Sequence, residues 1–498
     1  MIKKFITSSN HAFFFSLLPT IALVLVGFFF FSFSVHAATI TVSPDQSIQS
    51  AINSASSGDK IVVSGNHSSE SISISKNNLT VEASGTVQTK GFTVTGSGIT
   101  VRGFTIINLT GTGMTANSGS NNLIENNKFL YNGNRGLFLN NNTSSWTVRN
   151  NYFHRNNTAG VDVRGTNHLA EGNEVTHTIQ YHPCVQATSG ADADGFRFFG
   201  SGHIFRNNWI HDMPDGGSGY DQTACSIEQV ANLSNDYDKD SHTDCFQTYA
   251  GSSPAGHDIL FEGNICELPP VSEWTAGAGA KAFQGSGNIY NLTFKNNLVI
   301  ADFISLFYDD CDNVVYDHNT FIGSNSSNVY GGLKYHDCGS DAGSVKNNIF
   351  VGYRGGSGRF EIVNSSPDVG YNCVYLPDRN PLRPPDPGDV WGVDPRLDAN
   401  YHLQSDSPCI GAAEDGSDIG AFPYGGQIPT ISITPGLPTE TTAKTGDANG
   451  DGSVDGADYI IWLNHYGQNV SGSTSGDFNN SGTVDGSDYI LWLSNYGE

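Results

Sequence analysis

Short apolar runs that end in a polar tag recur along much of this sequence. Typical copies are Ile124-Glu125-Asn126-Asn127 and Val148-Arg149-Asn150-Asn151. Further copies stand at Val101–Phe104, Ala170–Asn173, Ile204–Asn208, Leu260–Asn264, Thr293–Asn297, Tyr316–Asn319 and Val345–Asn348. Where nothing is inserted, they follow one another at about 22 to 24 residues, which is typical of one coil of a solenoid. A glycine precedes a second apolar strand within the coil, as in Gly136-Leu137-Phe138-Leu139.

This pattern predicts an all-β domain over residues 39–425. Strands this short cannot bury a face alone, so they must stack on copies of themselves as a right-handed parallel β-helix. Residues Ile48 to Ala55 predict a short amphipathic helix that caps the N-terminal end, and Asn400 to Phe422 closes the other end. That closing segment and the opening Gly58-Asp59-Lys60-Ile61-Val62-Val63 resemble a large group of secreted bacterial β-helix proteins. The resemblance specifies a fold far better than a chemistry.

The N-terminus has the pattern of a secretory signal peptide, predicted over residues 1–38. Lys3 and Lys4 precede an apolar run from Phe13 to Phe33, and small residues follow at Ala37 and Ala38. The run is also long enough to span a bilayer, so an uncleaved N-terminal anchor is the alternative. Either interpretation places the mature protein outside the cell, secreted or attached to the cell surface.

Composition limits the classes of function. A net charge of -25 excludes binding of nucleic acid through phosphate neutralisation and suits a protein that holds cations. All eight cysteines lie between Cys184 and Cys409, which in an oxidising compartment indicates disulfides rather than metal ligation. Spacing alone does not fix the pairing; we expect Cys311 to bond Cys338, about one repeat away.

A second module follows a Pro- and Thr-rich linker, predicted over residues 426–445. This module, residues 446–498, contains two copies of one acidic loop, from Asp447 to Asp458 and from Asp477 to Asp488. Oxygen donors at fixed loop positions and a glycine at the sixth suit Ca²⁺, so two ions are expected. The predicted ligands are Asp447, Asn449, Asp451, Ser453, Asp455 and Asp458 in the first loop and Asp477, Asn479, Ser481, Thr483, Asp485 and Asp488 in the second.

Each loop leads into an amphipathic helix, and an Asp occupies the twelfth position of each loop. This duplication resembles a dockerin, a family whose paired loops bind Ca²⁺ and whose helices dock a cohesin. The resemblance implies a cohesin-like scaffold or cell-surface protein as a partner. Gly456-Ala457 and Gly486-Ser487 replace the Ser-Thr pair that is common in the family, so the choice of partner stays open.

The candidate chemistry lies in three segments that align as neighbouring coils. They are Asp192–Phe198, His242–Thr248 and Gly279–Gly285, and they place Asp194, Asp244 and Lys281 at one position. Equivalent positions on adjacent coils of a parallel sheet are roughly 4.8 Å apart. Two carboxylates this close need a shared proton or a cation between them. Arg197 and Lys281 supply part of that charge, and Ca²⁺ held by Asp192, Asp194 and Asp244 is a candidate for the rest.

Alternation along the strands sends Asp162, Arg197, Gln247 and Gln284 outward on one face, which Lys334 and His336 continue. Three long insertions, 179–191, 213–241 and 268–278, are expected to enter at the same corner of successive coils and to wall a groove. The candidate substrate-binding residues are Gln247, Gln284, Lys334 and Trp274, and the candidate catalytic residues are Lys281, Arg197, Asp194, Asp244 and His242.

The Asp-Ala-Asp-Gly-Phe segment and the two segments aligned with it resemble the β-helix pectate lyases of polysaccharide lyase family nine. In that family Ca²⁺ binds the uronate carboxylate and a lysine removes the neighbouring proton. Asp194 and Asp244 match two of the family's calcium ligands. Thr243 and Gln247 stand where acids are expected, and Gln284 stands where the lysine is expected, so Lys281 takes its place only by alignment.

Three functions therefore remain open for the β-helix. A lyase is slightly favoured, with Lys281 or Arg197 as the base. A glycoside hydrolase would use Asp194 and Asp244 at about 5 Å, or one of them with a more distant acid such as Asp215 or Asp310. A β-helix that binds glycans or adheres to surfaces without catalysis is the third possibility. The polysaccharide and its linkage are not predicted.

Overall fold

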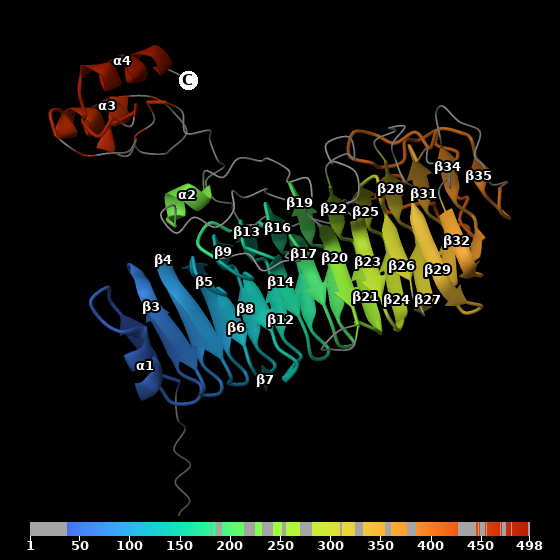
Figure 1. Cartoon of the computed structure of the whole chain (residues 1–498), viewed down its shortest axis with the longest axis horizontal. Coiled ribbons are helices and arrows are strands. Elements are labelled where there is room, and N and C mark those ends of the chain that lie inside the picture. Colours follow the sequence, from blue (N-terminus) through green and yellow to red (C-terminus); the bar gives the residue numbers. More distant parts are fainter. Residues whose placement is uncertain are drawn as a thin grey trace, which may run out of the picture. The chain divides into compact units, whose positions relative to one another are not determined.

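The computed structural model describes residues 37–180, 182–185, 192–213, 225–231, 243–250, 255–268, 281–308, 311–323, 332–353, 360–375, 385–426, 445–446, 448, 454, 456–468, 470, 475–479 and 481–496. Its main body is a stack of short parallel strands (Figure 1). Within the described residues, 33 strands join into one parallel sheet, which confirms the predicted β-helix. The predicted signal peptide lies almost wholly outside these residues, as does nearly all of the linker. No helix in the described ranges is long and apolar enough to cross a membrane.

Each full coil contributes one strand to each of three ladders. The first ladder runs through β3 (His67–Ile74), β4 (Thr80–Val94), β6 (Met114–Ala116), β10 (Leu137–Leu139), β14 (Ala159–Val163), β17 (Asp194–Phe198), β20 (Asp244–Tyr249), β23 (Lys281–Ser286), β26 (Ser305–Tyr308), β29 (Leu333–Gly339) and β32 (Phe360–Ser365). It carries the candidate site.

The second and third ladders follow the first within each coil. The second contains β1 (Thr39–Val42), β2 (Lys60–Val63), the start of β4, β5 (Thr100–Ile106), β8 (Leu123–Glu125), β12 (Thr147–Arg149), β15 (Leu169–Glu171), β18 (Ile204–Arg206), β21 (Ile259–Glu262), β24 (Ile289–Lys295), β27 (Cys311–Asp317), β30 (Gly343–Lys346) and β33 (Asp368–Gly370). The third contains β9 (Lys128–Leu130), β13 (Tyr152–His154), β16 (Glu174–Thr176), β19 (Trp209–His211), β22 (Ile265–Glu267), β25 (Leu298–Ile300), β28 (Thr320–Ile322), β31 (Ile349–Val351), β34 (Cys373–Tyr375) and β35 (Val390–Trp391). Two short strands, β7 (Gly119–Ser120) and β11 (Thr143–Ser144), pair separately.

The last two residues of the asparagine-ended tags have separate structural roles. The first turns the chain with a positive φ; it is asparagine in most tags, as in Asn126 (φ 56°) and Asn150 (φ 52°), a conformation that asparagine tolerates well, and Gly172, Gly263 or His318 in the others. The second points inward and bonds its counterpart on the next coil: Asn127 Nδ2 donates to Asn151 Oδ1 at 3.1 Å and to Val101 O at 3.0 Å. The buried ladder continues through Asn173, Asn208, Asn264, Asn297, Asn319, Asn348 and Asn372. It satisfies the polar backbone at the corner between the second and third ladders.

Charges alternate in sign along the outer side of the second ladder. One register column reads Glu82, Arg102, Glu125, Arg149, Glu171, Arg206, Glu262, Lys295, Asp317 and Lys346. Arg149 Nη2 lies 2.7 Å from Glu125 Oε2, and Arg206 Nε lies 2.9 Å from Glu262 Oε2. Exposed pairs of this kind contribute about 0.2–1 kcal/mol each. If the stacking skipped one coil, residues of the same charge would become neighbours and repel, so the column also favours the observed stacking.

Stacked aromatic rings and disulfides hold the interior. Phe196, Phe246 and Phe283 stack on successive coils with ring centroids 5.5 Å or less apart. The predicted Cys311–Cys338 disulfide is confirmed. The other disulfides in the described residues are Cys184–Cys225, Cys245–Cys266 and Cys373–Cys409.

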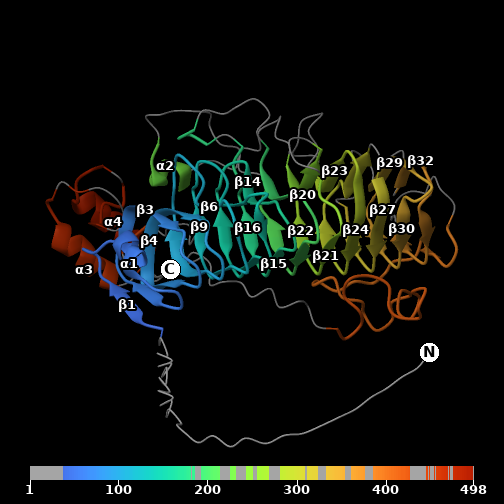
Figure 2. The same ribbon diagram turned by 90° about the horizontal axis from the view of Figure 1, so that it is seen from below.

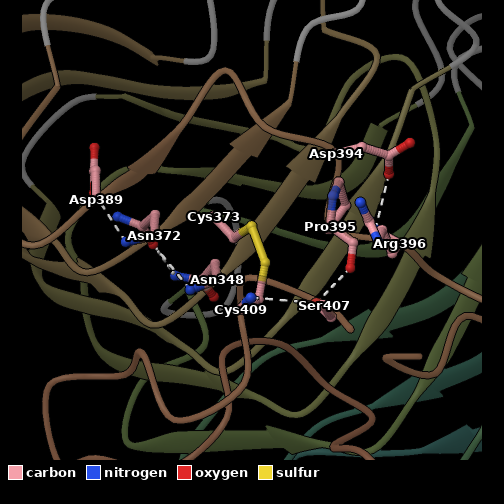
Figure 3. Close-up of a disulfide and its surroundings, with 9 residues drawn as sticks. All are labelled: Asn348, Asn372, Cys373, Asp389, Asp394, Pro395, Arg396, Ser407 and Cys409. Atoms are coloured by element: carbon pink, nitrogen blue, oxygen red, sulfur yellow. Dashed lines mark hydrogen bonds between the residues drawn. A yellow bond between two sulfur atoms is a disulfide. The ribbon is translucent and has the colours of Figure 1, made fainter. Parts of the chain in front are cut away.

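Both ends of the stack are closed. Helix α1 (Ile48–Ser54), with Ser47 as its N-cap, buries Ile48 and Ile52 and lies beside β1 to β3, as predicted (Figure 2). At the C-terminal end, Asp389 Oδ1 accepts the amide N–H of Asn372, the last asparagine of the ladder. The Cys373–Cys409 disulfide joins this coil to the closing segment (Figure 3).

The described part of the C-terminal module contains two helices, α3 (Gly456–His465) and α4 (Gly486–Asn495). They bury a small apolar core of their own, which includes Val454, Trp462, Val484 and Trp492. Leu463, Ile490 and Leu493 remain at least 48% exposed, so apolar side chains also occupy the outer faces of both helices. One more helix, α2 (Ile227–Ala231), belongs to an insertion, and Arg155 Nη1 donates to Val230 O at its end.

Candidate functional site

The first ladder brings the predicted site residues together in the predicted register. Strands β17, β20 and β23 lie on successive coils (Figure 1). Asp244 pairs with Lys281, and Phe196 with Phe246, so Asp194 lies one coil before Asp244. In a second column, Asp162 pairs with Arg197, Arg197 with Gln247, and Gln247 with Gln284. The column continues through Leu306 to Lys334.

Asp194, Asp244 and Lys281 start their strands and are linked from coil to coil. Asp194 Oδ1 accepts the N–H of Asp244 at 3.1 Å, and Asp244 Oδ1 accepts the N–H of Lys281 at 3.2 Å. The two aspartates are fully buried and Lys281 is 7% exposed. Their side chains do not enter the apolar interior, because both carboxylates bond side chains of the outward column. Gly195 accounts for this orientation. A Cβ on Gly195 would lie 2.8 Å from Ile210 inside the coil, so position 195 faces inward and its neighbour Asp194 faces outward.

Arg197 is fixed by two carboxylates. Its Nε donates to Asp194 Oδ2 at 2.6 Å and its Nη2 to Asp192 Oδ2 at 2.9 Å. Burial raises the pKa of Asp194 well above its usual range, and Arg197 only partly opposes this. The pKa of Arg197 is raised further by the two carboxylates, although burial opposes the rise. A guanidinium held protonated in this way cannot act as a base, so we drop that alternative for Arg197.

The glutamines of the outward column meet the same row of acids. Gln247 Nε2 donates to Asp244 Oδ2 at 3.1 Å. Gln284 Oε1 is buried, and among the described residues it has no hydrogen-bond partner. A buried amide oxygen of this kind is suited to accept a hydrogen bond from a hydroxyl group of a bound molecule.

Two lysines approach one aromatic ring. Lys281 Nζ lies 5.7 Å and Lys334 Nζ 5.0 Å from the centroid of the Phe303 ring. Lys334 and His336 are partly exposed while Leu333 and Tyr335 are buried, which confirms that the outward face continues this far. The face therefore places two amino groups against one aromatic ring.

The predicted groove cation does not fit this arrangement. Asp194 uses one oxygen on the Asp244 N–H and the other on Arg197, and Asp192 also binds Arg197. Within the described ranges, no group of three or more His, Cys, Asp or Glu side chains is arranged to hold a metal. The guanidinium of Arg197 stands where Ca²⁺ was expected, so these residues do not fit a metal in this face.

Several predicted residues lie outside the described residues. They are His242, Trp274, Asp215 and Asp310, together with the ligands Asp447, Asn449, Asp451, Ser453 and Asp455 of the first acidic loop. The long insertions join third-ladder to first-ladder strands, between β16 and β17, β19 and β20, and β22 and β23, which confirms that they enter at one corner.

Sequence reasoning missed two polar groupings. Arg135 and Arg164 both bind Asp162 on the first ladder, and the only sequence signal is an arginine beside a corner glycine, as in Arg135-Gly136 and Arg164-Gly165. On the third ladder, His211 bonds Asp212 and Glu174. Although burial lowers it, these hydrogen bonds raise the pKa of His211 to about 9.

The second acidic loop is folded around its own carboxylates. Asp477 accepts the N–H groups of Ser481 and Gly482 at 2.9 and 2.8 Å, and Asp488 accepts those of Asn479 and Asp485 at 3.1 and 2.8 Å. Asp477 and Asp488 are fully buried. No salt bridge to either is found in the described residues, so neither buried carboxyl group has a basic partner there. In this arrangement the oxygens of both carboxyl groups accept backbone N–H groups, and within the described residues no three acidic or histidine side chains converge on one point here either, so Ca²⁺ binding by this loop stays a prediction.

Comparisons with known proteins bear on the fold. Residues 32–179 match the family model described as right handed beta helix region. Pectate lyase Pel9A is 16% identical, with 78% of this chain and 97% of that chain covered and a TM-score of 0.43. The A-module of mannuronan C-5 epimerase AlgE6 from Azotobacter vinelandii is 13% identical (69% and 93% covered, TM-score 0.43), and the PL6 family alginate lyase AlyGC is 12% identical (77% and 59% covered, TM-score 0.42). A search of curated proteins found no match. The ladders of parallel strands and the family match over residues 32–179 together assign the main body of this chain to the right-handed parallel β-helix fold.

Proposed function

We propose that the first ladder binds an anionic polysaccharide and cleaves it by β-elimination, with Lys281 as the base. The observation that carries this proposal is the register of Asp244 with Lys281, one coil after Asp194. Residues far apart in the chain thereby form one row of acids and bases on an outward face. The sequence resemblance to family nine lyases around Asp194 and Asp244 points to the same chemistry.

The reaction assigns a separate task to each group. As the base, Lys281 Nζ takes the C5 proton of a uronate; a C4–C5 double bond forms and the C4–O bond breaks. The leaving oxygen takes a proton from water. Lys334, on the other register column beside Phe303, is placed to attract the uronate carboxylate, which makes the C5 proton more acidic. A general base contributes about 10²- to 10⁴-fold to rate.

The buried acids position Lys281 without needing to touch the sugar. Asp244 accepts the Lys281 N–H, and Asp194 accepts the Asp244 N–H. Arg197 neutralises Asp194, and Gln247 bonds Asp244. Asp194, Asp244 and Arg197 are therefore positioning residues, while Gln284 and Lys334 are placed to contact the sugar chain.

A hydrolase is the second candidate. The raised pKa of Asp194 beside Asp244 is the observation in its favour, since a glycosidase needs a protonated and an ionised carboxyl group. Each of the two carboxylates, however, already accepts hydrogen bonds through both oxygens. That engagement suits a positioning role better than the role of a nucleophile.

One assay separates these functions. The full chain is incubated with a panel of polysaccharides, and both ultraviolet absorbance of unsaturated uronate and reducing ends are followed. Absorbance that Lys281→Ala abolishes is expected for the lyase. Reducing ends without absorbance would replace it with the hydrolase, and binding without products would leave a glycan-binding β-helix.

We further propose that the C-terminal module binds two Ca²⁺ ions and docks a cohesin-like scaffold or cell-surface protein outside the cell. The buried Asp477 and Asp488 and the exposed apolar residues of α3 and α4 support this proposal. Equilibrium dialysis with Ca²⁺ tests the stoichiometry. A chain that binds no Ca²⁺ would refute the proposal for the module and leave the β-helix proposal untouched.

A further inference from the structure

The first ladder carries an excess of positive charge three coils before Lys281. Asp162, fully buried, pairs in register with Phe138 on the preceding coil and Arg197 on the next. Its Oδ2 accepts Arg135 Nε at 2.6 Å and its Oδ1 accepts Arg164 Nε at 2.9 Å. One carboxylate thus holds two guanidiniums. On the second ladder, by contrast, acidic and basic residues alternate one for one.

The two guanidiniums are held rigidly and remain accessible. The Arg135 Cζ lies 4.9 Å and the Arg164 Cζ 5.1 Å from the Phe138 ring centroid, and Arg164 also lies 4.7 Å from that of Phe199. Their side chains are 22% and 16% exposed. Arg135 uses Nε on Asp162 and Nη1 on Asn134, and within the described residues its Nη2 has no hydrogen-bond partner. Arginine on an aromatic platform is suited to a planar carboxylate.

From this geometry we infer a carboxylate-binding subsite made by Arg135, Arg164 and Phe138. It rests on the proposed function, because it takes a uronate of the same polysaccharide whose cleavage is assigned to Lys281. At roughly 4.8 Å per coil, the subsite lies roughly 14 Å along the ladder from Lys281. A sugar chain lying along the helix axis therefore places one uronate here while another unit, about three sugars away, reaches Lys281. The subsite selects for charge at a distance from the bond that breaks.

The inference is tested by binding, in a Lys281→Ala background that prevents turnover. Calorimetry at low salt measures the affinity for an oligouronate and for the same oligosaccharide with its carboxyl groups reduced to alcohols. Arg135→Gln is expected to weaken oligouronate binding about 10- to 100-fold and to leave binding of the reduced oligosaccharide unchanged. The matched control is Arg149→Gln, which removes an equal charge from the second ladder and is expected to change neither affinity.

Arg164 still pairs Asp162 in the Arg135→Gln variant, so the fold should survive, and circular dichroism checks this. If the fold does not survive, Arg135→Lys is used instead. It keeps the charge but loses the two parallel N–H donors of the guanidinium, and it should weaken binding of the oligouronate but not of the reduced oligosaccharide. Equal weakening by Arg149→Gln, equal weakening for both oligosaccharides, or no binding of the oligouronate would overturn the subsite. Arginine-dependent binding by a chain that never forms unsaturated product would keep the subsite and reject the lyase.

Discussion

Replacing Asp244 by Asn tests whether the buried acids serve the site or the fold. The carboxylate accepts two hydrogen bonds, from the Lys281 N–H at 3.2 Å and from Gln247 Nε2 at 3.1 Å. Asn keeps the shape and one acceptor, and Gln247 can rotate its amide to accept from the new NH₂ group. Charged hydrogen bonds exceed neutral ones by about 1 kcal/mol each, so the loss of stability should stay within about 2 kcal/mol.

The loss of activity should be much larger than the loss of stability predicts. Asn still offers an acceptor to the Lys281 N–H, but it removes a buried negative charge one coil before Lys281, so the electrostatic field at the base changes. We expect kcat/KM to fall at least about 100-fold, close to the effect of removing one preorganised electrostatic group. Urea unfolding measures stability, and the initial rate of unsaturated-product formation measures activity.

The matched control is Glu262→Gln, which removes a carboxylate from the second ladder. Glu262 Oε2 accepts Arg206 Nε at 2.9 Å and its side chain is 32% exposed, so its loss should cost no more than about 1 kcal/mol and leave activity unchanged. If Asp244→Asn folds normally and retains activity within a factor of about three, the positioning role is refuted.

Three further predictions concern the fold and the module. Asn264→Ala should destabilise the β-helix by roughly 4 kcal/mol or more in urea, since several buried hydrogen bonds lose a partner, and a cost below about 1 kcal/mol would contradict the ladder's role. Burial lowers the pKa of His168 to about 3 and that of His203 to about 4, so the unfolded chain binds protons first as pH falls below 6.5. Each histidine should therefore remove about 1.4 kcal/mol of stability per pH unit between pH 6.5 and about 4; stability unaffected by these histidines in His-to-Gln variants would refute this. Chelating Ca²⁺ should lower the melting temperature of the C-terminal module, and Asp477→Ala should reduce that response by removing the second of the two sites; a melt insensitive to chelation would count against the predicted loops.

The sequence was sufficient for the fold because the same local signals recur in every coil. Asn126 and Asn127 show why: one turns the chain and the other joins the buried ladder, so the tag itself encodes the stacking. The alignment of Asp194, Asp244 and Lys281 followed from the same regularity, and the register confirms it. The charged residues of the second ladder stand in the tags, but their alternation in one column becomes clear only from the register of the strands.

The contacts between side chains at the site could not be predicted in the same way. Repeat spacing places Arg197 on the outward face but does not tell whether its guanidinium turns toward Asp192 and Asp194 or toward a ligand. The pairing of Arg135 and Arg164 with Asp162 depends on side chains that leave the corners between strands, where no period applies. Such contacts are set by rotamers and local packing, which the repeat does not encode.

The most direct measurement follows ultraviolet absorbance while the purified full chain acts on oligouronates, in parallel with the Lys281→Ala variant. The proposed function predicts that unsaturated ends accumulate with the unmodified chain and that the variant, with an unchanged circular dichroism spectrum, binds the same oligosaccharides but forms at least about 100-fold less product. Equal product from the two proteins, or no absorbance with any uronate that the chain binds, would contradict it.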